Sequence, residues 1–547
     1  MKTAFNYLLR GGKKLFMKNN YLKIYVKNII FPCLFFSVVT GGLTGVTIVL
    51  YKLAVNFISG LSSDFYSAVR ANLIYIIPSL AALGLLAFLT EYFYRFFRDS
   101  KSGGIPTAIA ILRGLITFRW LRTLIGVIIG SLTSFFLGLP LGTEGPCVML
   151  GTAIGSGAVS LGGKKNRAWS RYVMTGGASA GFAVATNAPI SGVLFAIEEA
   201  HQRLSPMIIL VAGQSVIFSV ITSRLLSSVT GVSLDMFPGL SMPALQMREM
   251  WIPVLIGLLI GLFSVGYINL HKLITKLWQT KLKRVKKQII FFFIFALTFA
   301  FGLISDDFIG TGHHQATEAL NGNIVWYMLI AIICFRALMT NAANYTGATG
   351  GTLIPLLALG AMISSLIAKG LCAIGFIPDD KFTAVVILGI VACFAGMIKT
   401  PVTAVVFAIE AMNCYHNVLS VLIVAVLSYF VTEIFGAHSM TDEIIDEQVE
   451  RFNAGKTLQT FDGYVTVSPD AFVIGKAVRD IFWPSNTFVL AVKHSEKTVV
   501  DQHGDKKLSE GDVLHLRYST YNIDETEKEL YALVGEQAEE IVSQTEA

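Results

Sequence analysis

A carboxylate flanked by glycine lies in the middle of an apolar region of the chain. Glu144 belongs to the segment 142–146, Gly-Thr-Glu-Gly-Pro, which separates two apolar runs and therefore lies at membrane depth. An ionised side chain is costly there and is usually functional. Gly145 allows close approach to the backbone, and Pro146 suits the first turn of a helix. We expect a helix N-terminus whose unpaired N–H groups suit an anion, with a titratable gate beside it. The alternative is that Glu144 only caps that helix.

The composition is that of a polytopic membrane protein. Of the 547 residues, 54% are hydrophobic and 14% are charged, whereas about a quarter are charged in a soluble chain. The net charge of +7 comes from basic residues in short loops and at the N-terminus, which is typical of cytoplasmic segments rather than of a nucleic-acid surface. The chain has no evident nucleophile–base set, and its six cysteines lack metal-binding spacing. We therefore expect no enzyme, no cofactor and no metal.

The chain divides into five parts. These are a basic N-terminal segment (1–28), a membrane region (29–445), a linker (446–460), a small α+β domain (461–535) and a tail (536–547). Many apolar runs of the membrane region are shorter than a bilayer span and contain glycine or proline, as in transporters with broken helices. We expect the N-terminus and the small domain to be cytoplasmic.

The membrane region contains an internal repeat. The pattern Gly-Thr-x-x-Pro occurs at 142–146 and at 351–355, a shift of 209 (351 − 142). The sequence Phe-Ala-Ile-Glu occurs at 195–198 and at 407–410, a shift of 212 (407 − 195). Two patterns in the same order at nearly one shift predict two structurally related halves, about 29–228 and 250–435, with broken helices meeting between them. The order alone does not say whether the repeat is inverted.

These motifs make residues 25–450 resemble the CLC family of chloride channels and chloride/proton exchangers. Residues 142–146 match its Gly-x-Glu-Gly-Pro motif, so Glu144 corresponds to the external gating glutamate. Residues 351–355 match Gly-x-Phe-x-Pro, with Leu353 in place of phenylalanine. The resemblance implies an all-α polytopic membrane protein of the CLC type, a homodimer in the lipid bilayer of the cell membrane, with chloride as the transported ion.

Two family positions carry different residues in this chain. Residues 102–106 stand for Gly-Ser-Gly-Ile-Pro, and the anion-coordinating serine falls on Gly103. The central tyrosine falls on Met440. Without these two hydroxyls, backbone N–H groups and helix dipoles remain, so we expect weak anion selectivity. The implied anion-binding set is Ser102, Gly103, Gly104, Ile105, Gly145, Thr352, Leu353 and Met440.

Other polar residues carry less specific signals. The resemblance places the inner proton-transfer glutamate on Glu199. We expect Glu198 to end a solvated helix in a local ion pair and Glu410 to be structural. His313 and His314 are predicted to lie in a connecting loop, since further metal ligands are missing.

The small domain resembles the C-terminal domain of potassium-conductance regulators (RCK_C, TrkA-C type). Residues 474–480 and 508–514 carry the likeness, and strands are expected at 464–467, 488–492 and 513–516 before a helix at 525–534. Such modules dimerise, and some bind small ligands including cyclic di-AMP. Dimerisation without a ligand is the alternative.

Four functions remain open at this point. The leading interpretation is a passive chloride channel that is gated by Glu144 and modulated by the C-terminal domain, because Met440 suggests an inner gate that closes poorly. A chloride/proton antiporter is the first alternative, since Glu199 would permit coupling. Fluoride/proton export is the second, since fluoride exporters also depart at the serine and tyrosine positions. A non-conducting membrane scaffold is the third, although it would have no use for an intramembrane carboxylate.

Overall fold

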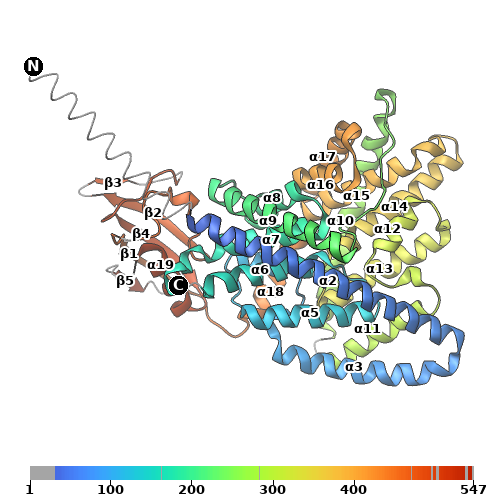
Figure 1. The fold of residues 1–547 in the computed structure, drawn as a ribbon, viewed down its shortest axis with the longest axis horizontal. Coiled ribbons are helices and arrows are strands. Elements are labelled where there is room, and N and C mark those ends of the chain that lie inside the picture. The colour runs from blue at the N-terminus through green and yellow to red at the C-terminus, as the bar shows by residue number, and fades with distance from the viewer. Residues whose placement is uncertain are drawn as a thin grey trace, which may run out of the picture.

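The computed structural model describes residues 31–161, 163–282, 284–469, 471–494, 497–499, 504–535 and 540–544. In these parts the chain forms a helical body with a β-sheet domain at one end (Figure 1). The predicted fold class, an all-α membrane body with a small α+β domain, is confirmed.

The helices of the body follow the apolar runs closely. They are α2 (Phe31–Ala71), α3 (Ile76–Phe96), α4 (Ile105–Leu112), α5 (Trp120–Phe136), α6 (Glu144–Leu161), α7 (Ser170–Thr186), α8 (Pro189–Leu194), α9 (Pro206–Thr230), α10 (Trp251–Thr280), α11 (Lys287–Gly302), α12 (His313–Leu320), α13 (Trp326–Thr346), α14 (Leu353–Ala373), α15 (Phe382–Ile398), α16 (Pro401–Met412), α17 (Val418–Ile434) and α18 (Met440–Asn453).

Within the described residues, eight helices are long and apolar enough to cross a bilayer: α2, α3, α9, α10, α13, α14, α15 and α17, some with a short preceding turn. On α3 the side chains of Ile77, Leu85 and Phe88 are more than half exposed. An apolar surface of this kind is what lipid tails would cover. The shorter helices α4, α6, α8 and α16 are the broken segments that the glycines and prolines predicted.

Glycines let the helices cross closely at equivalent places in the two halves. A Cβ on Gly151 of α6 would lie 2.0 Å from the carbonyl oxygen of Gly177 on α7. A Cβ on Gly360 of α14 would lie 2.8 Å from the carbonyl oxygen of Gly389 on α15. Because these pairs are related by the shifts read from the sequence, the repeat corresponds to two halves built alike.

Two helices extend into segments that the sequence left unassigned. α2 continues to Ala71 because Tyr66 is buried, with its hydroxyl donating to the Leu137 carbonyl (2.9 Å), and Arg70 pairs with Asp306 at 2.6 Å. α18 occupies part of the predicted linker. Its sequence is polar because one face is exposed, while Ile444 on the other face is buried against the body.

The C-terminal domain is a five-stranded antiparallel sheet with one helix. The strands β1 (Gln459–Thr466), β2 (Thr487–His494), β3 (Lys497–Val499), β4 (Val513–Thr520) and β5 (Glu540–Gln544) lie in the order β3-β2-β4-β1-β5. The helix α19 (Ile523–Val534) buries Leu530 and Leu533 in the domain core with strand residues such as Leu514. The domain is larger than the predicted 461–535, because β1 begins in the predicted linker and the predicted tail contributes β5, which pairs with β1.

Candidate anion and proton site

Three helices begin at one point inside the body. A Cβ on Gly145, in the first turn of α6, would lie 2.6 Å from the Cα of Gly351 and 2.8 Å from the Cα of Gly104. Gly351 precedes α14, and Gly104 is the residue before α4. Only glycine permits backbones to approach this closely. The first N–H groups of each helix have no intrahelical acceptor, so this convergence concentrates donors and partial positive charge.

The two halves are joined at this convergence by their equivalent glycines. The amide of Gly142 donates to the carbonyl of Gly351 at 2.6 Å, and the amide of Gly351 donates to the carbonyl of Gly142 at 2.7 Å. This is an isolated antiparallel bridge. A reciprocal bridge between positions that the repeat relates is the pattern expected when a two-fold axis relates the halves.

Glu144 is buried beside the convergence. Its Oε1 accepts a hydrogen bond from the Thr143 hydroxyl (2.8 Å) and lies 3.4 Å from Nε2 of His313. Among the described residues, Oε2 has no hydrogen-bond partner. The side chain therefore accepts no hydrogen bond from the first amides of α6, unlike a helix cap. His313 was predicted to lie in a loop. It is instead the first residue of α12, which begins after Gly312 at a φ of 114° that favours glycine.

Most of the predicted anion-binding residues lie at the three helix starts. Gly104, Ile105, Gly145, Thr352 and Leu353 flank or open α4, α6 and α14, and Ile105 and Leu353 are buried.

Ser102 and Gly103 precede α4 in a tight turn. Ser102 has a φ of 61°, a left-handed backbone that is uncommon for serine. A Cβ on Gly103 would lie 2.6 Å from the Thr349 methyl and 3.2 Å from a Val127 methyl. A side chain at position 103 therefore requires the Thr349 side chain to shift.

Met440 does not belong to any of the three helices that begin at the glycine convergence. It is the first residue of α18, is 2% exposed and belongs to the apolar core of the body. A thioether buried among apolar side chains fills space in that core.

Glu199 is buried at the side of the body that contacts the C-terminal domain, hereafter the domain side. It lies in a π-helical turn, Phe195–Ala200, a rare geometry that is frequent at functional sites. Its carboxylate accepts a hydrogen bond from the Thr441 hydroxyl at 3.0 Å. Arg113 holds the turn by donating to the carbonyls of Glu199 and Ala200, both within 2.9 Å. A cavity of about 250 Å3 is lined by Glu199, Thr441 and eight further polar residues and Ile398.

Glu198 and Glu410 are reciprocal helix caps. Glu198 therefore differs from the predicted local ion pair, whereas Glu410 has a structural role, as expected. The Glu198 carboxylate accepts hydrogen bonds from the amides of Val402 and Thr403 at the start of α16, at 3.0 and 2.6 Å. The Glu410 carboxylate accepts from the amides of Ile190 and Ser191 at the start of α8, at 2.8 and 2.9 Å. Each half thus caps a helix of the other half, which explains why the Phe-Ala-Ile-Glu sequence repeats.

The C-terminal domain contacts the segment that follows Glu199. The Phe482 ring lies 4.5 Å from the His201 ring and 4.4 Å from the Arg203 guanidinium. The Tyr172 hydroxyl of α7 donates to the carbonyl of Asp480 at 2.6 Å. Burial, and then the nearby arginines including Arg203, keep the pKa of His201 well below its usual value, so its ring is neutral.

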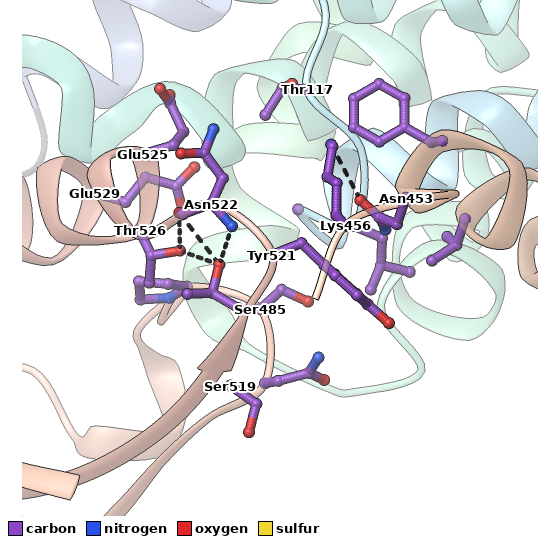
Figure 2. Close-up of a pocket in the computed structure, with 17 residues that line it drawn as sticks. Thr117, Asn453, Lys456, Ser485, Ser519, Tyr521, Asn522, Glu525, Thr526 and Glu529 are labelled. Carbon is purple, nitrogen blue, oxygen red and sulfur yellow. Dashed lines mark hydrogen bonds between the residues drawn. The ribbon is translucent and has the colours of Figure 1, made fainter. Parts of the chain in front are cut away.

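A small cavity of about 110 Å3 lies at the same junction (Figure 2). Both parts of the chain line it with polar side chains. These include Thr117, Asn453 and Lys456 of the body and Ser485, Tyr521, Asn522 and Thr526 of the domain.

Sequence reasoning missed the contact of His313 with Glu144 and those of Arg113 and Thr441 with Glu199 and its turn. His313 is 169 residues from Glu144 (313 − 144), and Thr441 is 242 residues from Glu199. The one available signal was Gly310-Thr311-Gly312, a glycine-rich break like those that precede α6 and α14.

Comparison with known proteins shows the family of the chain. The family described as "Voltage gated chloride channel" matches residues 82–433. The chain belongs to the voltage gated chloride channel family. The match ends before the C-terminal domain, whose resemblance to RCK_C domains stays a prediction.

The relatives of this family member include bacterial exchangers. The H(+)/Cl(-) exchange transporter ClcA of Vibrio vulnificus (strain YJ016) is 25% identical over 428 residues, 76% of this chain and 90% of the relative. That of Vibrio parahaemolyticus serotype O3:K6 (strain RIMD 2210633) is 27% identical over 429 residues, 76% of this chain and 89% of the relative.

Two solved structures share the fold of this family member. A slow cyanobacterial Cl-/H+ antiporter superposes with a TM-score of 0.68 at 23% identity, over 77% of this chain and 98% of the other. A CLC-type fluoride/proton antiporter gives 0.61 at 20% identity, over 74% and 96%. At these identities the likeness concerns the fold.

Proposed function

We propose that this protein exchanges chloride for protons across the cell membrane. The observation that carries the proposal is Glu199, a carboxyl that is 4% exposed in a π-helical turn and borders a polar cavity on the domain side. A passive anion pathway has no need of a second buried carboxyl, whereas a proton that crosses needs one titratable group toward each face. The names of the curated relatives also favour exchange over the passive channel that Met440 suggested.

The anion would be held by the N–H groups at the starts of α4, α6 and α14. Fixed dipoles replace lost hydration without a full opposing charge, so the anion can also leave. Glu144 is adjacent and, once turned away from His313, its ionised carboxylate would compete for the same N–H groups. Protonation removes that competition. Alternation of anion and carboxylate at one place is the physical basis for coupling their movements.

Met440 gives no support to a leaking inner gate. It is almost fully buried, and the domain-side cavity is lined by its neighbours Ser439 and Thr441 instead. An apolar side chain packed in this way resists passage of a hydrated ion.

The test is simultaneous recording of chloride and proton movement in liposomes that contain the full-length protein. An imposed chloride gradient should drive protons uphill, and Glu199→Gln should abolish proton movement while chloride flux persists. Glu433→Gln is the matched control, since Glu433 lines the same cavity but pairs with Lys399 and is 45% exposed. Chloride flux without uphill proton movement in the wild type would restore the channel interpretation.

The same liposomes separate chloride from fluoride. We propose chloride, and a fluoride flux that greatly exceeds the chloride flux would favour the exporter alternative. A protein that moves neither ion would fit the scaffold. We further propose a homodimer, which the mass of the purified protein in detergent checks, with the domain side and the N-terminus in the cytoplasm.

We also propose that the C-terminal domain is an RCK_C-type regulatory module. Its contact with His201 and Arg203 is supportive, because these residues directly follow the turn that carries Glu199. A ligand could shift transport only by its differential affinity for two states. Titration of cyclic di-AMP against residues 457–547, and flux after truncation at Thr457, test the proposal. No binding and unchanged flux would leave a dimerisation role.

A further inference from the structure

The buried carboxylate of Glu144 lies next to a titratable side chain, His313, that is partly exposed to solvent. In the described residues, the side chain of Glu144 is 1% exposed, so bulk water does not reach its carboxylate directly. Within the described part of the chain, its ion-pair partner is His313, with Nε2 at 3.4 Å from Oε1. The His313 side chain is 34% exposed. One imidazole therefore lies next to the buried carboxylate and is itself partly exposed, on α12, which lies in the part of the body away from the sheet domain (Figure 1).

Other charged or titratable groups surround this pair on several elements. Lys52 and Tyr51 on α2 and Cys147 on α6 interact electrostatically with Glu144. Lys52 donates to the carbonyls of Val184, Ala185 and Leu234, so its hydrogen atoms are committed elsewhere.

The groups behind His313 are also occupied. Arg336 on α13 donates to the carbonyls of Ile309 and Gly310, just before α12. His314 pairs with Asp307 at 3.4 Å and points to a different partner than His313 does. His313 is thus the histidine placed to exchange a proton with Glu144.

We propose that His313 is the proton relay between the external solution and Glu144. The inference rests on the proposed exchange function and adds a residue to its proton path. In the inward direction, a neutral imidazole with a proton on Nε2 accepts a proton at Nδ1 from a hydronium ion of the external solution, which leaves water. The Nε2 proton then passes to Oε1 of Glu144. One proton enters and one leaves, the ring ends neutral as the other tautomer, and Glu144 becomes a neutral acid that no longer competes with the anion.

The protonation step also changes the attraction that holds Glu144 in place. While imidazolium and carboxylate face each other at 3.4 Å, their opposite charges hold Glu144 next to α12. After transfer both groups are neutral, so that attraction is lost and Glu144 is free to turn toward the helix starts. The relay thus delivers the proton and releases its acceptor in one event.

The experiment compares His313→Gln with His314→Gln in liposomes that contain the full-length protein. Glutamine keeps hydrogen bonding but cannot carry the proton. We expect proton-coupled chloride transport to fall about tenfold or more in His313→Gln, which is less than the roughly 10²- to 10⁴-fold that positioned acid–base groups contribute. His314→Gln should transport as the wild type does, which controls for the loss of a histidine in the same helical turn. Equal rates in the two variants would overturn the relay.

A second pair of variants separates proton transfer from a structural effect. In the background Glu144→Gln, where no proton can be received, His313→Gln should leave the remaining chloride flux unchanged. A tenfold loss in that background as well would show that His313 shapes the path and would overturn the relay. Non-additivity of this kind identifies residues that act on one another.

The failure of the relay and the failure of the exchange proposal give different results. If the wild type moves chloride but pumps no protons, exchange fails by itself. The relay is then judged by whether chloride flux still follows steps of external pH in His313→Gln. An unchanged response overturns it, and a slowed response supports it as the proton supply of a gate.

Discussion

The two buried carboxyls of the transport body are held in opposite ways. Glu144 lies among glycine backbones, with one hydroxyl donor and one histidine as its recorded side-chain partners. Glu199 lies among side chains, in a turn that Arg113 ties to α4, with Thr441 of α18 as its donor. Each carboxylate has few side-chain partners, but Arg113 fixes the backbone turn that carries Glu199. This difference fits a role for Glu144 as a gate that moves and for Glu199 as a proton-transfer group that stays in place.

The largest effect should follow from the loss of the movable carboxyl. Glu144→Gln mimics the protonated form, so chloride flux should become insensitive to external pH and proton coupling should vanish. Flux of liposomes across a range of external pH measures this. Wild-type pH dependence in the variant would remove Glu144 as the gate and end the contrast with Glu199.

Adding a single methyl group to the glycine convergence should have the next largest effect. In Gly145→Ala the new Cβ would lie 2.6 Å from the Cα of Gly351 and 2.8 Å from that of Gly104, so the three helix starts must separate. We expect at least about a tenfold loss of chloride flux, because displacement of binding groups by about 1 Å costs up to a hundredfold. Gly213→Ala is the control, since a Cβ there meets no atom within 4 Å. Equal flux in both variants would show that backbone contact is not what builds the site.

Restoring a hydroxyl near the helix starts should sharpen selectivity. Gly103→Ser alone collides with the Thr349 methyl, so the informative variant is Gly103→Ser with Thr349→Ser. The second change removes the methyl and keeps the hydroxyl that bonds Tyr94 and the Ser100 carbonyl. We expect discrimination among chloride, bromide and nitrate to rise about threefold, the value of a modest hydrogen bond. Thr349→Ser alone is the control, and identical selectivity in the two would contradict the role of position 103.

The smallest effect should come from trimming the network around Glu199. Thr441→Val replaces the hydroxyl donor by a methyl group of similar volume. It keeps the hydrogen bond that the backbone amide of residue 441 donates to the Ser439 hydroxyl. Because Arg113 still holds the turn, we expect proton coupling to fall only about two- to threefold, with chloride flux at fixed pH unchanged. If Thr441→Val abolishes proton coupling completely, as we expect Glu199→Gln to do, then the function of Glu199 depends on a single hydrogen bond. In that case Glu199 is held no more firmly than Glu144.

Periodicity and repetition predicted most of the fold. Apolar runs located the spanning helices because lipid contact requires them, and the two repeats located the halves because equivalent glycines serve equivalent crossings, as at Gly151 and Gly360. α18 was missed because its polar composition hides a buried stripe at Ile444. β5 was missed because its stability comes from pairing with β1, far away in the sequence.

The candidate site was predicted only where its chemistry is local. Glu144 and the glycines stand in contiguous motifs, so their type and spacing sufficed. Other contacts of the site join residues that are far apart in the sequence, namely those of His313, Arg113 and Thr441. The residues next to them in the chain give no indication of these partners. The role of Glu198 was misjudged for the same reason, because its carboxylate caps a helix of the opposite half, whereas Glu410 was predicted to be structural and is a helix cap.

The reciprocal caps impose an order on biosynthesis. When α16 emerges, the carboxylate that accepts its first amides is already present, because Glu198 precedes Thr403 by 205 residues. The start of α8 has to wait, since Glu410 follows Ser191 by 219 residues. Until that residue is made, the nascent chain carries amide groups at the start of α8 without their acceptor. The first half is therefore completed only when the second half is synthesised. A chain that ends before Glu410 leaves the amides of Ile190 and Ser191 without their carboxylate acceptor.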